Sequence, residues 1–156
     1  DVFDPAAQAF DPIARDYEAA VERGVRLSGE GRAYFSRGRV AFLASELRRR
    51  GAHAAIQQVL DFGCGTGPTA LHLREAFPAA ALTAADPSAR MLEEARLRAS
   101  DTRVQFLHAE CGDLPRGRFD LIYAANVFHH IEPGRRHGVL RDLHAIQAKH
   151  SGRMVV

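Results

Sequence analysis

The spacing of apolar and polar positions changes along this chain and predicts where strands and helices lie. After residue 57, short apolar runs alternate with stretches whose apolar residues recur every three or four positions. The runs predict strands at Gln58–Phe62, 81–85, Val104–His108, 120–125 and 153–156, and the stretches predict helices at 68–76, 88–99 and 135–149. Strands that alternate with helices in this way form a parallel sheet covered on both faces. The pattern predicts an α/β fold with a doubly wound, mainly parallel sheet.

Two helical regions precede the first predicted strand. The nearer one, at 32–50, has Phe35, Val40, Leu43 and Leu47 on one face, and Gly51 suits the position just beyond a helix end. The first thirty residues contain Phe-Asp-Pro twice, at 3–5 and 10–12, and an Asp followed by Pro is typical of a helix start. Residues 1–30 are therefore predicted to be helical.

The first predicted strand leads into Val-Leu-Asp-Phe-Gly-Cys-Gly-Thr-Gly at 59–67. Glycine tolerates positive φ and has no Cβ, so Gly63, Gly65 and Gly67 indicate a backbone that turns sharply and approaches a ligand. A dinucleotide fingerprint would need glycine at 63, 65 and 68, but residue 68 is Pro, and the Gly-Lys-Ser/Thr of a P-loop is missing here. A turn in an ordinary α/β domain is the alternative interpretation.

This stretch resembles motif I, D-x-G-x-G-x-G, of the class I S-adenosylmethionine (SAM) methyltransferases. The resemblance implies a loop around the amino-acid end of SAM, with Asp61 near its ammonium group and contacts from Gly63, Cys64, Gly65 and Gly67. It also implies the sheet order 3-2-1-4-5 followed by two further strands, which have no counterpart in the sequence. We therefore expect one SAM-binding domain over 1–156 that is truncated after the fifth strand, as in a fragment of a longer protein.

The end of the second predicted strand carries Asp86. It follows Gly67 by 19 residues, the usual distance for an acid that accepts hydrogen bonds from ribose hydroxyls. Capping of the next helix is its alternative role, although Ser88 is itself a good N-cap residue. The segment Asp-Pro-Ser-Ala-Arg-Met-Leu at 86–92 resembles the family's D-x-S-x-x-M-L, which implies that Pro87 and Met91 flank the adenine ring.

The segments after the third and fourth strands resemble the family as well. The run Ala-Glu-Cys-Gly-Asp-Leu-Pro at 109–115 resembles D-A-x-x-L-P, which implies that Glu110 accepts from the adenine amine and that the Cys111 N–H donates to the ring. Asp113 is a rival for the role of Glu110. By resemblance, the backbone at Asn126 meets the methionine moiety of SAM, and Val127 lies near its methyl group.

Three residues are candidates for a catalytic role. His129 and His130 could act as a general base, or could be structural residues at a helix start. Tyr17 belongs to a segment, 10–17, that resembles the F-D-x-x-A-x-x-Y opening of small-molecule methyltransferases. In that family the segment forms a lid over the cofactor, so residues 1–30 are expected to be an N-terminal helical lid. A packing helix with Phe10, Ala14 and Tyr17 buried is the alternative.

Composition and charge narrow the possible partners. The formal net charge is +2 and the arginines are scattered, which argues against a nucleic-acid surface. The sequence contains no apolar run of about 18 residues, so no membrane span is predicted. The two cysteines are too few for a disulfide framework, and this low number fits a reducing cytoplasm. No metal site is predicted, and the oligomeric state is left open.

The sequence therefore predicts a SAM-dependent methyltransferase that yields S-adenosylhomocysteine (SAH) and acts on a small molecule. The small-molecule branch is favoured because the opening segment resembles it and no basic groove is indicated. The Asn-Pro-Pro-Tyr of adenine-N6 and related amino methyltransferases is missing after the fourth strand, which counts against nucleobase chemistry of that type. An RNA or protein methyltransferase and a non-catalytic SAM-binding module are the alternatives.

Overall fold

The computed structural model describes residues 32–99, 103–110, 113–147 and 153–155. Its helices are α3 (Arg32–Arg49), α4 (Pro68–Ala76), α5 (Ala89–Arg98) and α6 (Arg136–Ile146), with short 3-10 helices η3 (His53–Ala55), η4 (Phe128–His130) and η5 (Pro133–Arg135). Its strands are β1 (Gln58–Phe62), β2 (Ala81–Asp86), β3 (Val104–His108), β4 (Leu121–Tyr123) and β5 (Arg153–Val155).

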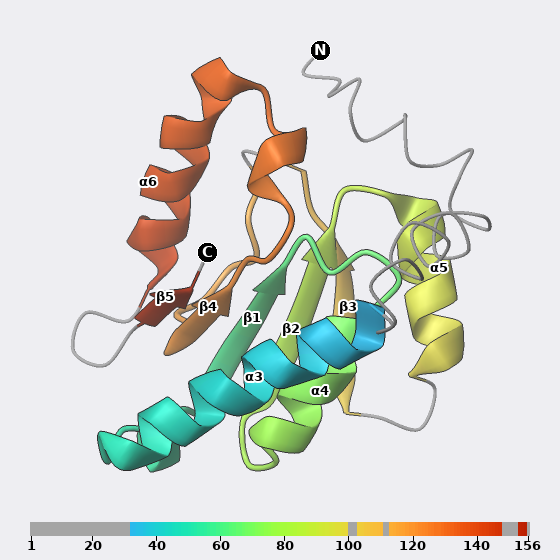
Figure 1. Ribbon diagram of the computed structural model, residues 1–156. Helices are drawn as coiled ribbons and strands as arrows, with labels where there is room; N and C mark the ends of the chain where they lie inside the picture. The colour runs from blue at the N-terminus through green and yellow to red at the C-terminus, as the bar shows by residue number, and fades with distance from the viewer. Residues whose placement is uncertain (1–31, 100–102, 111–112, 148–152, 156) are drawn as a thin grey trace.

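The described strands form one sheet in the order β3-β2-β1-β4-β5, and every neighbouring pair is parallel. This confirms the predicted strand order and places β1 at the centre of the sheet. Figure 1 shows that the strands point the same way, so the loops after β1, β2 and β4 leave from one edge. In a doubly wound sheet, this carboxyl-terminal edge is where ligands bind.

Helices cover both faces of the sheet, as predicted. On one face, Val59 and Leu82 pack into a buried cluster with side chains of α3, α4 and α5, among them Leu47, Leu73 and Leu92. On the other face, Leu60 and Ile122 pack with Val139 and Leu143 of α6. Successive residues of a strand point to opposite faces, so the neighbours Val59 and Leu60 feed separate clusters. Figure 1 shows α3 and α4 together on one side of the sheet and α6 beside β4 and β5.

Helix α3 ends as predicted but buries a different stripe from the one expected. Gly51 has φ +67, and the N–H of Ala52 donates to the carbonyl of Leu47 at 2.8 Å, which closes the helix in a Schellman motif. The prediction that Phe35 belongs to the buried face was wrong, because its side chain is 43% exposed. Phe35 precedes the buried Val40 by five residues, about 140° around the helix, so the two cannot share a face.

The elements around the carboxyl-terminal edge differ slightly from their predicted bounds. Strand β2 continues through Asp86, whereas β4 ends at Tyr123 and the chain leaves the sheet before Ala124 and Ala125. Helix α4 begins at Pro68, directly after the glycine stretch, with Gly67 as its N-cap at φ +89. Proline is acceptable at the first helical position because its missing N–H would have no intrahelical partner there.

Candidate functional site

The loop after β1 is held against the end of β2 by backbone hydrogen bonds. The N–H groups of Gly63 and Cys64 both donate to the carbonyl of Ala85, at 2.8 and 3.1 Å. The N–H of Gly65 donates to Oδ2 of Asp86 at 2.8 Å. The structure thus brings together the glycine loop and the acid that sequence analysis placed in one site.

The three loop glycines have different neighbours. All have positive φ, from +55 to +89. A Cβ on Gly63 would lie 2.4 Å from Cγ2 of Val127, so these two predicted site residues are in contact and leave no space for a larger residue. A Cβ on Gly67 would lie 3.0 Å from that of Ala95 in α5. At Gly65 no atom of the described residues lies within 4 Å of the same position, which leaves room beside the backbone for a bound molecule.

Asp86 organises the loop rather than capping α5. Its side chain is buried, and its Oδ1 accepts the N–H of Ser88 at 2.9 Å. Ser88 is the N-cap of α5, because its Oγ accepts the N–H of Met91 at 3.2 Å. The expectation that Ser88 takes the capping role is confirmed. Met91 itself is buried, with 3% of its surface exposed.

Asp61 is the most unusual group of the site. It lies within β1 between Ala84 of β2 and Tyr123 of β4, and only 2% of it is exposed. Its Oδ2 has no hydrogen-bond partner among the described residues. Burial, together with the smaller effect of the nearby charge of Asp86, raises the pKa of this carboxyl to about 8. A buried polar atom without a partner is costly, which marks Asp61 as a group that a bound cation would satisfy.

The cysteine of the loop is a packing residue. Cys64 is buried in the cluster beneath α3 and α4. Burial raises the pKa of its thiol well above the ordinary value, and the charges of Asp61 and Asp86 act in the same direction. The thiol therefore stays neutral, and contact between this residue and a ligand would come through its backbone.

The segment after β3 reaches the same edge. The N–H of Ala109 donates to the carbonyl of Asp86 at 3.2 Å, so the half-buried Glu110 follows directly from a residue tied to β2. The N–H of Asp113 donates back to the carbonyl of Glu110 at 3.0 Å, and Asp113 is exposed. Pro87 is half-buried, and its carbonyl lies 2.8 Å from Nε2 of His108. Cys111 falls outside the described residues.

The segment after β4 closes the site beside the glycine loop. Asn126, the residue before Val127, has φ +59, in the left-handed region that non-glycine residues seldom adopt. His129 is exposed and His130 is half-buried in η4, with ring centroids 3.7 Å apart.

Within the described ranges, no group of three or more Cys, His, Asp or Glu side chains could hold a metal ion. Tyr17 falls outside those ranges.

A second set of residues, near the carboxyl-terminal edge of the sheet, was not predicted from the sequence. Tyr34, Arg39 and Phe42 of α3 line a cavity together with Tyr123 of β4. Tyr34 and Phe42 lie off the buried stripe of α3, and two such aromatic residues could have indicated the cavity from the sequence.

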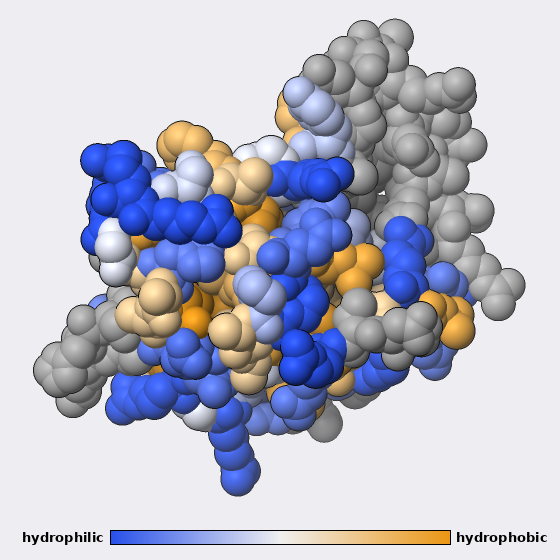
Figure 2. All heavy atoms as spheres, turned by 90° about the horizontal axis from the view of Figure 1, so that it is seen from below, coloured by the Kyte–Doolittle hydropathy of each residue, from blue (hydrophilic) through white to orange (hydrophobic). Residues whose placement is uncertain are grey.

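None of the described helices is suited to span a membrane. Over the parts of the chain that the structure describes, no helix is both long and apolar enough to cross a membrane. Figure 2 shows the face seen from below, where hydrophilic residues surround smaller hydrophobic areas.

Comparison with known proteins gives consistent matches. Residues 59–150 match the family described as "Methyltransferase domain". The protein named "Uncharacterized methyltransferase Rv0089" of Mycobacterium tuberculosis is 37% identical over 81 residues, which cover 51% of this chain and 40% of that protein. "Trans-aconitate 2-methyltransferase" of Klebsiella pneumoniae is 38% identical over 82 residues, which cover 52% of this chain and 32% of that protein. The chain thus matches less than half the length of either relative.

A solved structure supports the fold over a longer stretch. Magnesium protoporphyrin IX methyltransferase (ChlM) from Synechocystis PCC 6803, with bound SAM, superposes with a TM-score of 0.65 at 19% identity. The superposition covers 94% of this chain and 74% of that one. At this level of identity the similarity shows a shared architecture.

Proposed function

We propose that this chain, which belongs to the methyltransferase-domain family, binds SAM and transfers its methyl group to a small-molecule acceptor. The observation that carries the proposal is the buried Asp61, whose Oδ2 lacks a partner among the described residues while the neighbouring glycine loop leaves its backbone open at Gly65. A molecule with a cationic group near Asp61 and a body along the loop would satisfy both features.

Each predicted residue is assigned to one part of SAM in this proposal. Asp61 would accept from its ammonium group, and the backbone of Gly63, Cys64, Gly65 and Gly67 would follow its amino-acid end. Asp86 would accept from the ribose. Asn126 and Val127 would lie beside the methionine moiety and methyl group, which the contact between Val127 and Gly63 supports. The remaining proposed contacts are to the adenine, from Pro87, Met91, Glu110 and Cys111.

The cofactor supplies a methyl group on a sulfonium, which is already a good leaving group. The task of this chain is then to orient the acceptor and to exclude water, and orientation alone can be worth about 7–11 kcal/mol. A proton leaves the acceptor only if its nucleophile carries one. His129 and His130 at the start of the segment after β4 are the candidates to receive it, and Tyr17 of the predicted lid is a third.

A small molecule is the favoured acceptor. The name of the Klebsiella relative specifies trans-aconitate, a small acid, as its acceptor. The scattered arginines and the low net charge of this chain support the same class over RNA. The cytoplasm is our proposed location, which rests on the cysteine content.

The test separates binding from transfer and uses the full-length protein. Titration calorimetry should give one site each for SAM and SAH and no appreciable heat with NAD. Incubation with methyl-labelled SAM and a cell extract, followed by size fractionation, should place the label in the small-molecule fraction. Label in RNA or protein would favour the alternative acceptors, and binding without any transfer would favour a non-catalytic module.

A further inference from the structure

Helix α3 exposes aromatic side chains on the flank that does not face the core. Tyr34 is 62% exposed, Phe35 43% and Phe42 72%, and they account for three of the four large hydrophobic residues that are exposed among the described residues. Single exposed hydrophobic residues are common on proteins, but aromatic residues gathered on one surface indicate a binding site.

These rings form one wall of a cavity. The cavity has a volume of about 600 Å³, and the end of β4 and the residues that follow it, Tyr123 to Asn126, also line it. Sites for small molecules have volumes of about 300–1,000 Å³ and are mostly apolar with a few polar groups. The cavity therefore has the size and the lining of a small-molecule site.

The cavity adjoins the proposed cofactor site. Asn126 lines the cavity, and its neighbour Val127 contacts Gly63 of the glycine loop. A molecule in the cavity and a molecule on the loop would share the turn at Asn126 and Val127. This is the arrangement that a two-substrate transfer reaction requires, because the two reacting groups must meet at one place.

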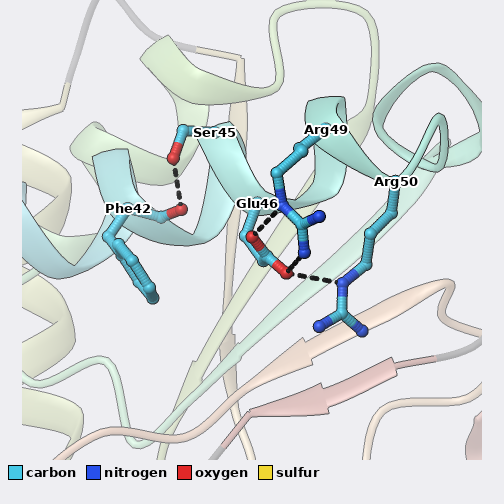
Figure 3. A network of polar contacts seen from close by, with 5 residues as sticks. All are labelled: Phe42, Ser45, Glu46, Arg49 and Arg50. Atoms are coloured by element: carbon cyan, nitrogen blue, oxygen red, sulfur yellow. Dashed lines mark hydrogen bonds and ion pairs between the residues drawn. The ribbon is translucent and has the colours of Figure 1, made fainter.

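Two charged side chains of α3 line the cavity. Oε1 of Glu46 accepts hydrogen bonds from Nη2 of Arg49 and from Nε of Arg50, each at 2.6 Å. Figure 3 shows this network with Phe42 on the same flank of the helix. These two arginines lower the pKa of Glu46 to about 2, so its carboxylate is ionised and already paired with two cations. Arg39 also lines the cavity and forms no ion pair within the part of the chain that the structure describes.

We propose that the cavity between α3 and the end of β4 holds the methyl acceptor, and that the acceptor is an organic anion with a flat apolar body. Tyr34, Phe35 and Phe42 contact the body, and Arg39 binds the anionic group. Among the charged lining residues, Glu46 is already paired, so the charge that remains to be matched is positive. This inference rests on the proposed function, because it assigns the second substrate of the same site.

The test uses two fluorescent probes that share one apolar body. The first is 8-anilinonaphthalene-1-sulfonate (ANS), which is anionic, and the second is the neutral N-phenyl-1-naphthylamine. ANS should bind to the full-length protein at one saturable site. Arg39→Gln should weaken ANS about tenfold and leave the neutral probe within about twofold, because only the anion loses a charged hydrogen bond. Phe42→Ser should weaken both probes by about tenfold, because both lose apolar contact.

Matched variants control for position and for folding. Arg37→Gln removes a cation from α3 outside the cavity lining, and Leu97→Ser removes an exposed hydrophobic residue from α5. Neither should change the binding of either probe. Each variant should also bind SAH with the wild-type affinity, which shows that it is folded.

Three results would overturn the proposal. Displacement of ANS by SAH would place the probe in the cofactor site instead. Equal losses of both probes in Arg39→Gln would remove the preference for an anion. A dimer by sedimentation whose dissociation exposes the ANS site would show that a second copy occupies the cavity. Failure of the proposed function is a separate result, namely no binding of SAM or SAH to the wild-type protein.

Discussion

Oδ2 of Asp86 accepts the backbone N–H of Gly65 at 2.8 Å, so a carboxylate at the end of β2 fixes the loop that follows β1. The same carboxylate accepts the N–H of Ser88 through Oδ1 at 2.9 Å. One side chain therefore links the glycine loop to the start of α5. Its removal is expected to affect a ligand in two ways, through lost contact and through a loosened loop.

Replacement of this side chain should weaken SAM binding. For Asp86→Ala we expect a loss of roughly 1.5–3 kcal/mol, or about 10- to 150-fold in Kd, measured by calorimetry. Asp120→Ala is a matched control, because Oδ2 of Asp120 also accepts two backbone N–H groups, from Gln57 and Gln58 at 2.9 Å, at the opposite edge of the sheet. The control should lower stability without changing affinity. Unchanged affinity in Asp86→Ala would contradict the assigned site.

The affinity for SAM should rise with pH between about pH 6 and pH 7.5. The pKa of Asp61 in the ligand-free protein is raised to about 8, so its carboxyl is protonated at lower pH. Pairing with a cation requires the ionised form, and binding then releases up to one proton, which permits up to a tenfold gain per pH unit. Above that range the ammonium group of SAM itself begins to deprotonate, since α-amino groups have a pKa of about 7.7–8.0.

Calorimetry in buffers of different ionisation enthalpy measures the released proton directly. Asp61→Asn should abolish the release and flatten the pH profile. The ionisable groups around Asp61 are Asp86, Cys64 and Tyr123, and the first two leave the expected sign unchanged, because Asp86 adds negative charge and the Cys64 thiol stays neutral. Burial also raises the pKa of Tyr123, which keeps its phenol neutral in this range. A flat wild-type profile would show that Asp61 does not titrate with binding.

The same substitution should stabilise the protein in the absence of ligand. A carboxyl whose folded pKa lies near 8, against an ordinary value of 3.8, binds a proton more tightly in the folded state. The resulting stability is complete below the ordinary value and is lost as pH rises through the folded pKa. Asn at position 61 avoids this loss, so the Tm of Asp61→Asn should exceed that of wild type by several degrees at pH 8, at about 2–4 °C per kcal/mol. The difference should shrink as the pH approaches 4, and an unchanged Tm at pH 8 would argue that Asp61 is ionised at little cost.

Glu110 rather than Asp113 should recognise the adenine amine. Glu110 is half-buried after a residue tied to Asp86, whereas Asp113 is exposed. Glu110→Ala should reduce SAM affinity, and Asp113→Ala should leave it within about threefold, as for a surface substitution of under ~0.5 kcal/mol. The opposite ranking in the same calorimetric assay would mean that the site lies further along this loop.

The predicted lid can be tested although residues 1–30 lie outside the described ranges. Hydrogen exchange over this segment should slow on addition of SAH, while β1 changes less, because lids complete a site when ligand binds. Tyr17→Phe should reduce turnover more than cofactor affinity if its hydroxyl faces the acceptor. Equal protection with and without SAH would favour the alternative of a packed structural helix.

Hydrophobic spacing predicted most of the fold, because a parallel sheet has few possible orders once strands and helices alternate. The bounds of β1, α4 and β3 agree with the prediction, and Asp61 and Asp86 lie at one edge because the carboxyl ends of parallel strands meet there. The hydrogen bond from Gly65 to Asp86 could not be predicted, since it depends on how two strands and their loops are placed relative to one another. The exposure of Phe35 was not predicted, although its distance of five residues from Val40 places the two side chains on different faces of α3.

The burial of Asp61 has a consequence for the amount of protein in a cell. A folded state that holds an unsatisfied carboxyl is weakened when the site is empty. A ligand that binds only the folded form restores stability by mass action, about 2.7 kcal/mol at a hundred times its Kd. Chaperones and proteases act on the unfolded fraction, so changes of about 1–2 kcal/mol can alter abundance several-fold. The steady-state level of this protein should therefore follow the supply of its cofactor.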